Sequence, residues 1–190
     1  MQTSQAMAAR ALRETRAWLV HAIIGLNLCP FAKAPHGKDR IRYVVSEATT
    51  TDALIAGLGD ELARLVATDE EQIETTLLIH PWVLGDFLAF NDFLAVGDAV
   101  IADADLEGVI QLASFHPQYR FADTDADDPG NATNRSPYPT LHLLRESSVA
   151  RSVAAVPDTA AISEANIERL QRLGPEGWGR LQQRCRDEAA

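Results

Sequence analysis

The stretch "ETTLLIHPWVLGDFLAFNDFLAVGDAVIADADLEGVIQLASFHP", residues 74–117, decides the fold. It begins and ends with short apolar runs, and each run stops at a His-Pro pair. Such runs are typical of buried strands, which proline cannot continue. Between them, Phe87, Leu88 and Leu94 follow the spacing of one helical face. The order strand, helix, strand predicts a crossover connection and hence a parallel pair of strands in one sheet.

The preceding residues continue this alternation. Residues 40–47 (RIRYVVSE) predict another strand, and a helix capped by Thr50 or Thr51 separates it from the strand that follows. A first helix is expected over residues 5–26, where apolar side chains recur with helical spacing, and a loop over residues 31–39.

The C-terminal part predicts one more strand and several helices. Residues 140–146 (TLHLLRE) alternate like a strand, although Pro139 could equally open a helix there. Gly174 should close one of the terminal helices, and Pro175 should start the last. We therefore predict one α/β domain over residues 1–190, with a small parallel or mixed sheet of three to four strands and helices packed on it.

Composition limits the class of protein. The chain has 190 residues, of which 46% are apolar and 23% charged, as in an ordinary globular domain. Its formal charge of -10 argues against broad binding to nucleic acid or anionic membranes, which requires clustered Lys and Arg. We find no secretory signal pattern and no apolar run of the roughly 20 residues that span a bilayer. We therefore expect a cytoplasmic protein in which Cys29 and Cys185 stay reduced.

Histidines mark the ends of two predicted strands. His80 ends "LLIHP" and His116 ends "LASFHP". Ligands gather beyond the carboxyl ends of strands in open α/β sheets, and parallel strands would bring both imidazoles to one edge. Imidazole transfers protons or binds metals near neutral pH, so both are candidate catalytic residues. The alternative is that each side chain only hydrogen-bonds the turn that follows its strand.

Residues 116–140 form a long polar loop with almost nothing apolar to bury. Long loops inside compact domains are usually either functional or disordered. The aspartate-rich centre fits disorder, whereas the flanks "FHPQYRF" and "NRSPYP" carry aromatic residues, arginines and prolines. We therefore expect a ligand-binding loop with ordered ends and a mobile centre.

Two arginines of this loop are the predicted anion binders. A guanidinium matches a carboxylate or phosphate with two hydrogen bonds, so Arg120 and Arg135 are candidates for holding an anionic substrate. Asn134 and Asp123 could orient the substrate, and Lys33 could join from the loop before the first strand. Alternatively, these cations pair with the loop's own aspartates. The aspartates lack the spacing of a calcium loop, so the sequence specifies no metal.

Cys29 is a candidate nucleophile. Pro30 ends the predicted helix, which places the thiol at a helix C-terminus, whose negative charge should raise its pKa. Lys33 or His116 could reverse this effect if either lay close in space. The alternative is a buried, inert cysteine.

Three stretches carry a resemblance to a known family: "WLVHAIIGLNLCPFAK" at 18–33, "FHPQYRF" at 115–121 and "NRSPYPTLHLLRE" at 134–146. Through them the chain resembles the bacterial domain of unknown function family 1415, from about residue 10 to residue 174. The resemblance implies no activity, cofactor or catalytic residue, so every role considered above comes from the residues themselves.

These observations support three hypotheses. The first is a small cytoplasmic enzyme that binds an anionic small molecule at the strand ends and polar loop, with His116 as acid or base. The second is a non-catalytic metal- or ligand-binding protein that uses Cys29, His80 and His116. The third is an accessory protein whose loop folds onto a partner. The sequence specifies no cofactor and no oligomeric state.

Overall fold

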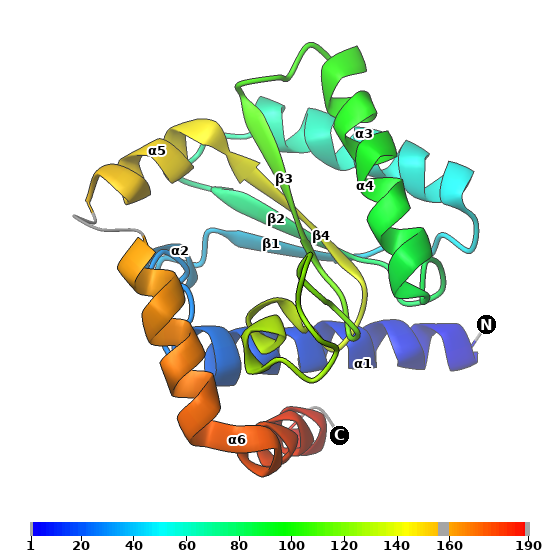
Figure 1. Cartoon of the computed structure of the whole chain (residues 1–190). Helices are drawn as coiled ribbons and strands as arrows, with labels where there is room; N and C mark the ends of the chain where they lie inside the picture. Colours follow the sequence, from blue (N-terminus) through cyan, green and yellow to red (C-terminus); the bar gives the residue numbers. More distant parts are fainter. Residues whose placement is uncertain (1, 156–159, 189–190) are drawn as a thin grey trace.

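The computed structural model describes residues 2–155 and 160–188. At its centre is one four-stranded sheet with the order β1-β2-β4-β3 (Figure 1). β1 and β2 pair in parallel, and β4 is antiparallel to both of its neighbours, β2 and β3. The strands are β1 (Ile41–Val45), β2 (Thr75–Ile79), β3 (Ile110–Phe115) and β4 (Thr140–Arg145). The predicted α/β fold with a mixed sheet is confirmed, and the segment after Pro139 is a strand rather than a helix.

Helices connect and cover the strands. The cap predicted for the helix after β1 is Thr50, whose hydroxyl accepts the N–H of Ala53 at 3.3 Å. No described helix is long and apolar enough to cross a membrane. The helices are α1 (Gln2–Trp18), α2 (Lys33–Gly37), α3 (Thr51–Ala67), α4 (Phe87–Asp103), α5 (Glu146–Ala154) and α6 (Ala160–Glu188), with a π-helical turn η1 (Leu19–Ile24) and a 3-10 helix η2 (Pro129–Asn134).

Two helical layers enclose the sheet (Figure 1). α3 and α4 cover one face, where Leu58 and Phe90 pack with Leu141 of β4. α1 and α6 cover the other face, where Trp18 and Leu170 belong to a second apolar cluster. β1 and β3 supply both clusters because their side chains alternate between the two faces. Burial of one such large apolar side chain contributes about 1.5–3 kcal/mol.

The first predicted helix is not α-helical over its last residues. The α-helix α1 ends at Trp18, and the chain continues as the wider π-helical turn η1, where the N–H of Gly25 donates to the carbonyl of Val20 at 2.9 Å. A Cβ atom at Gly25 would lie 2.4 Å from the carbonyl oxygen of His21, so this wide turn requires glycine. The predicted loop over residues 31–39 contains one helical turn, α2.

α6 consists of two helices joined at a kink. Gly174 has φ 66°, a backbone conformation that other residues rarely adopt, and Pro175 restarts the helix. This is the break that the sequence predicts. Figure 1 shows the second half of α6, in red, turning beneath α1, so the two halves contact different parts of the molecule.

Candidate functional site

The carboxyl ends of β2 and β3 bring two of the predicted residues together. Both strands run antiparallel to β4, so His80 and His116 follow them at the same edge of the sheet. Both imidazoles pack against the ring of Phe90 in α4, with centroid distances of 5.7 and 5.1 Å. The two histidines therefore form one cluster with Phe90 on the face that α3 and α4 cover.

His116 is buried with both ring nitrogens bonded. Its Nδ1 accepts the N–H of Gln118 at 3.0 Å, so the proton is on Nε2, which donates to the carbonyl of Leu84 at 3.3 Å. The residue is 0% exposed, and burial lowers its pKa. Neutral and bonded at both nitrogens, His116 is not positioned to exchange a proton with a ligand.

His80 is equally buried but has only one bonded nitrogen. Its Nδ1 donates to the carbonyl of Val83 at 3.1 Å. Nε2 is thus an acceptor, and it has no partner among the described residues. Burial lowers the pKa of His80 to about 4, so the ring is neutral at pH 7.

The two histidines fix the connection between β2 and α4. Val83 and Leu84, whose carbonyls they bond, lie next to each other in this connection. Leu84 has φ 58°, a left-handed conformation that costs a non-glycine residue roughly 1–2 kcal/mol. The hydrogen bond from His116 helps to hold it. Of the two interpretations of these histidines, the structure favours hydrogen bonding to the turns over catalysis.

The polar loop is folded around Asn131, a residue that we did not select from the sequence. Its Oδ1 accepts the N–H of Phe121 at 2.9 Å and the hydroxyl of Thr124 at 3.0 Å, and its Nδ2 donates to the carbonyl of Asp125 at 2.8 Å. Asn131 is 0% exposed. These bonds hold the aspartate-rich centre, for which we expected mobility. Asp-Pro-Gly directly before Asn131 is the turn signal that could have identified it.

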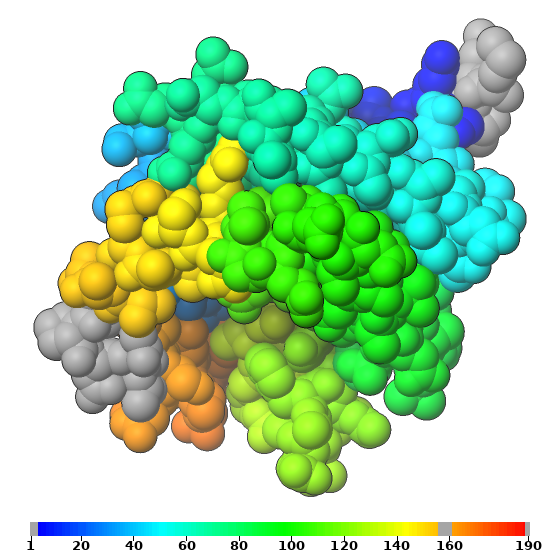
Figure 2. All heavy atoms as spheres, turned by 90° about the horizontal axis from the view of Figure 1, so that it is seen from above, coloured from blue at the N-terminus to red at the C-terminus, as the bar shows by residue number. Residues whose placement is uncertain are grey.

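This loop protrudes from the molecule. Figure 2 shows it in yellow-green beside α4 and the first half of α6. Tyr119 attaches it to the N-terminus of α4, since its ring lies 5.4 Å from the ring of Phe87. The loop is therefore anchored to α4 by its first flank.

Arg135 is bonded to the backbone of the loop rather than to its acids. Nε donates to the carbonyl of Tyr119 at 3.1 Å, and Nη2 donates to that of Ala126 at 2.6 Å. Within the described residues, no carboxylate pairs with Arg135 and its Nη1 makes no hydrogen bond. Partial burial lowers its pKa. The positive charge of Arg135 is thus unmatched.

A cavity of about 220 Å³ lies between this loop, α1 and the second half of α6. Arg135 lines it, and so does Trp18. Trp18 is 2% exposed, and its indole N–H has no hydrogen-bond partner in the described part of the chain. Trp18 therefore contributes ring surface to the cavity, while its indole N–H is itself buried, and of these two side chains only Arg135 offers a donor there.

Glu14 adds a carboxylate to the cavity wall, but its charge is matched. Its Oε1 accepts the Nε–H of Arg10 at 2.7 Å, and the hydroxyl of Tyr138 also bonds it. Burial first, and then the contact with Glu14, raise the pKa of Tyr138 to about 12. We did not select Glu14, Trp18 or Tyr138 from the sequence, because only the packing of α1 against the loop brings them together.

The other predicted binding residues lie outside this cavity. Asn134 ties the end of the loop to β3: its Nδ2 donates to the carbonyl of Ser114, and its own carbonyl accepts the N–H of His116, each at 3.1 Å. Arg120 and Asp123 are exposed on the loop, and Lys33 is exposed in α2.

Cys29 lies away from the histidines. It packs with Leu28 in the cluster between the sheet, α1 and α6, whereas His80 and His116 lie on the opposite face. Burial raises the pKa of its thiol, which disfavours the nucleophilic thiolate. Across residues 2–155 and 160–188, no group of three or more His, Cys, Asp and Glu side chains could hold a metal ion. The metal-binding hypothesis thus gains no support from the structure.

Comparison with protein families places the chain among known sequences. The model of the family described as "Protein of unknown function (DUF1415)" matches residues 10–180. The chain belongs to this family. The DUF1415 match includes both buried histidines, the polar loop and most of the cavity wall. No curated protein and no solved structure shows significant similarity to the chain.

Proposed function

We propose that the protein binds a small anionic molecule in the cavity beside the polar loop, with Arg135 as the principal anion contact. The observation that carries this proposal is the unmatched guanidinium of Arg135 in the wall of a cavity of about 220 Å³. A partly buried cation without a counter-ion carries a desolvation cost, which a bound anion would offset. In a chain of net charge -10, this is a local positive site.

The hydrogen bonds of Arg135 support the proposal. The carbonyls of Tyr119 and Ala126 fix Nε and Nη2, so the guanidinium is oriented before a ligand arrives. Nη1 is left to donate to a ligand. Arg186 lines the cavity as well and is exposed, which puts a second cation at the side open to solvent.

The geometry supports binding better than catalysis. Tyr138 and Cys185, two cavity residues that could act as base or nucleophile, both have a raised pKa, and burial is the main cause in each case. Both are therefore protonated near neutral pH and unreactive. His116 lies on the other face of the sheet, beside Phe90. We therefore propose a binding protein rather than the enzyme hypothesised from the sequence.

A cytoplasmic location is part of the proposal. Both cysteines are free thiols in the structure, as is usual in a reducing compartment. Protein alkylated during denaturation, without reductant, should carry the alkyl group on Cys29 and on Cys185 when examined by mass spectrometry. Recovery of a disulfide would contradict this location.

Titration of simple anions tests the proposed binding. Inorganic phosphate and benzoate are added separately while tryptophan fluorescence is followed, because Trp18 lines the cavity. We expect the tighter of the two anions to lose at least tenfold in affinity in Arg135→Gln, since a charge-assisted hydrogen bond is removed. Arg120→Gln is the matched control, because it removes an exposed arginine of the same loop. Equal affinity in wild type and Arg135→Gln, or a loss in Arg120→Gln alone, would overturn the proposal.

A further inference from the structure

We infer that the outer face of α4, extended by the neighbouring polar loop, is a docking surface for a basic amphipathic helix of another protein. No residue of α4 lines the cavity, so the inference does not depend on the proposed anion binding. It follows from three properties of this surface: exposed apolar side chains, acidic side chains without a counter-ion, and small residues that leave room for a partner.

An apolar stripe on α4 faces solvent. Leu88, Ala95 and Ala99 are exposed and stand at positions i, i+7 and i+11, which puts them on one side of the helix. Leu88 is 64% exposed, more than any other large apolar residue of the described chain. The buried side of the same helix supplies Phe90 and Phe93 to the core. α4 therefore has apolar residues on both sides, whereas a surface helix normally has a polar outer face.

The polar loop extends this surface at the start of α4. The ring of Phe121, which is 39% exposed, lies 5.0 Å from the ring of Tyr119, and that ring lies 5.4 Å from the ring of Phe87. Figure 2 shows the loop, in yellow-green, beside α4, in green. Exposed apolar surface bordered by polar residues marks sites of protein interaction, and aromatic rings are frequent anchors there. Leu88 and Phe121 thus offer two apolar anchors on adjacent elements.

The charge around these anchors is almost entirely negative. Residues 84–134 contain ten Asp and Glu and one Arg, a net charge of -9, whereas the whole chain has a net charge of -10. Within the described residues, none of these ten carboxylates takes part in an ion pair. The negative charge of the protein is therefore concentrated on α4, the turns around it and the polar loop.

Two of these carboxylates flank the apolar stripe. Asp92 and Asp98 are exposed, and at 3.6 residues per turn they lie about 40° to one side of Leu88 and about 80° to the other. A stripe bordered in this way complements a helix with leucines on one face and lysines on both sides of it. Ala95 and Ala99 allow that helix to lie close to α4, because the distance between packed helices depends on the side chains at the contact.

The charge selects this partner over other occupants. Two copies of the chain joined through this surface would bring two acidic faces together, which like-charge repulsion opposes. Nucleic acid and anionic membranes are repelled for the same reason. The described carboxylates also form no group that could hold a metal ion. A segment with apolar anchors and positive charge remains.

Binding of a designed peptide tests the inference. The probe is a fluorescent peptide of leucine and lysine, with its leucines at i, i+3, i+4 and i+7, and its anisotropy is followed as protein is added. We expect saturable binding that weakens severalfold when salt is raised from about 0.05 M to about 0.5 M, since salt screens exposed charges. Leu88→Ser should weaken binding at least tenfold by removing an anchor. Asp92→Asn combined with Asp98→Asn should weaken it severalfold and reduce its dependence on salt.

Matched controls make the same chemical changes elsewhere. Val153→Ser replaces an exposed apolar residue of α5, and Glu164→Gln combined with Glu168→Gln removes two exposed carboxylates of α6. Both controls should bind the peptide as wild type does. A second peptide, in which glutamates replace the lysines, should not bind. Circular dichroism confirms that each variant is folded.

Three outcomes would overturn the inference. The first is that the wild-type protein does not bind the lysine peptide saturably at low salt. The second is that Leu88→Ser binds it as tightly as wild type, or that the controls weaken it equally, because binding would then follow total charge rather than this surface. The third is a wild-type dimer in analytical ultracentrifugation that Leu88→Ser abolishes, which would make the surface a contact between two copies of the chain.

Discussion

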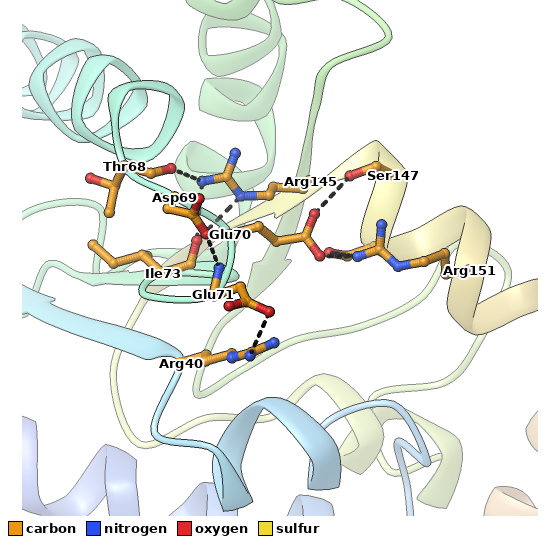
Figure 3. Close-up of polar contacts among 10 residues, drawn as sticks. Arg40, Thr68, Asp69, Glu70, Glu71, Ile73, Arg145, Ser147 and Arg151 are labelled. Carbon is orange, nitrogen blue, oxygen red and sulfur yellow. Dashed lines mark hydrogen bonds and ion pairs between the residues drawn. The ribbon is translucent and has the colours of Figure 1, made fainter.

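Arg145 lies at the C-terminal end of β4, and Arg135 lies in the loop before the N-terminal end of this strand. Both donate to backbone carbonyls, but their surroundings differ. Arg145, at the end of β4, donates through Nε to Ile73 at 3.2 Å and through Nη2 to Thr68 at 2.7 Å (Figure 3). Its Nη2 also donates to the carbonyl of Leu65 at 2.6 Å. Arg135 makes two such bonds, to carbonyls of the polar loop. Neither pairs with a carboxylate within the described residues.

The difference lies in what surrounds each charge. Leu65 and Thr68 are at the C-terminal end of α3, where the helix dipole is negative, so the positive charge of Arg145 is compensated. The bonds of Arg135 end at loop carbonyls that no helix aligns, and this side chain lines a cavity. An arginine whose charge the fold compensates stabilises structure, and one whose charge is left over is the better candidate for binding.

Two further ion pairs lie near Arg145 at this end of the strands. Figure 3 shows Glu70 bonded to Arg151 of α5, and Glu71 paired with Arg40 at 3.6 Å. The turn after α3 is thereby attached to both β1 and α5. The opposite edge has the buried histidines and the cavity that we propose as an anion site.

Replacement of the two arginines should separate stability from binding. Arg145→Met leaves three carbonyls without their donor and should lower the free energy of unfolding by about 3 kcal/mol. Arg135→Gln removes two bonds from a protruding loop and should cost about 1 kcal/mol. Urea unfolding followed by circular dichroism measures both values.

A matched control for Arg145→Met is Arg151→Gln, which removes an exposed ion pair with Glu70 and should cost less than about 1 kcal/mol. If Arg145→Met lowers the free energy of unfolding no more than Arg135→Gln does, then Arg145 is not the more stabilising of the two arginines.

Acid should destabilise the protein through its buried histidines. The pKa of His80 is lowered by burial from 6.5 to about 4, so the unfolded chain binds a proton between these values and the folded chain does not. Stability is complete above about pH 6.5 and is lost as pH falls towards 4, by about 3 kcal/mol for this group. His142, whose pKa burial lowers to about 4 as well, adds to the loss.

His80→Asn tests this assignment, because the amide can keep the hydrogen bond to Val83 but cannot titrate. The free energy of unfolding of this variant should fall less between pH 6.5 and pH 4 than that of wild type. Parallel pH profiles for the two proteins would show that His80 is not the group responsible.

The smallest expected change in stability concerns the kink in α6. Gly174 has φ 66° and orients the half of α6 that covers the cavity, so Gly174→Ala should cost about 1 kcal/mol through backbone strain. Gly59, inside α3, has open space where a Cβ would lie, so Gly59→Ala should stabilise by about 0.5–1 kcal/mol. Thermal unfolding of both variants checks the opposite signs. A stabilising Gly174→Ala would mean that the kink is not held by the positive φ.

Much of the fold could be predicted because its signals are local. The apolar runs that end at His80 and His116 predicted two strands correctly. Thr50 predicted the start of one helix, and Gly174 predicted the end of another. The position of β4 between β2 and β3 was not predictable in this way, since strand order depends on pairing between residues far apart in sequence.

The candidate site was less accessible to sequence reasoning. Arg135 was selected because guanidinium chemistry is independent of context, but Trp18 was not, since a tryptophan on an apolar helix face predicts only packing. His116 shows the converse, because its position after a strand suggested catalysis while its burial became visible only in three dimensions. A residue's type indicates the chemistry it can perform, and its packing decides whether it does so.

A crystal structure of the protein with benzoate tests the central claim most directly. We predict density for the ligand in the cavity between α1, the polar loop and α6, with its carboxylate within hydrogen-bond distance of Arg135 Nη1. Benzoate bound elsewhere, or an empty cavity at a benzoate concentration that saturates the protein in solution, would contradict the account.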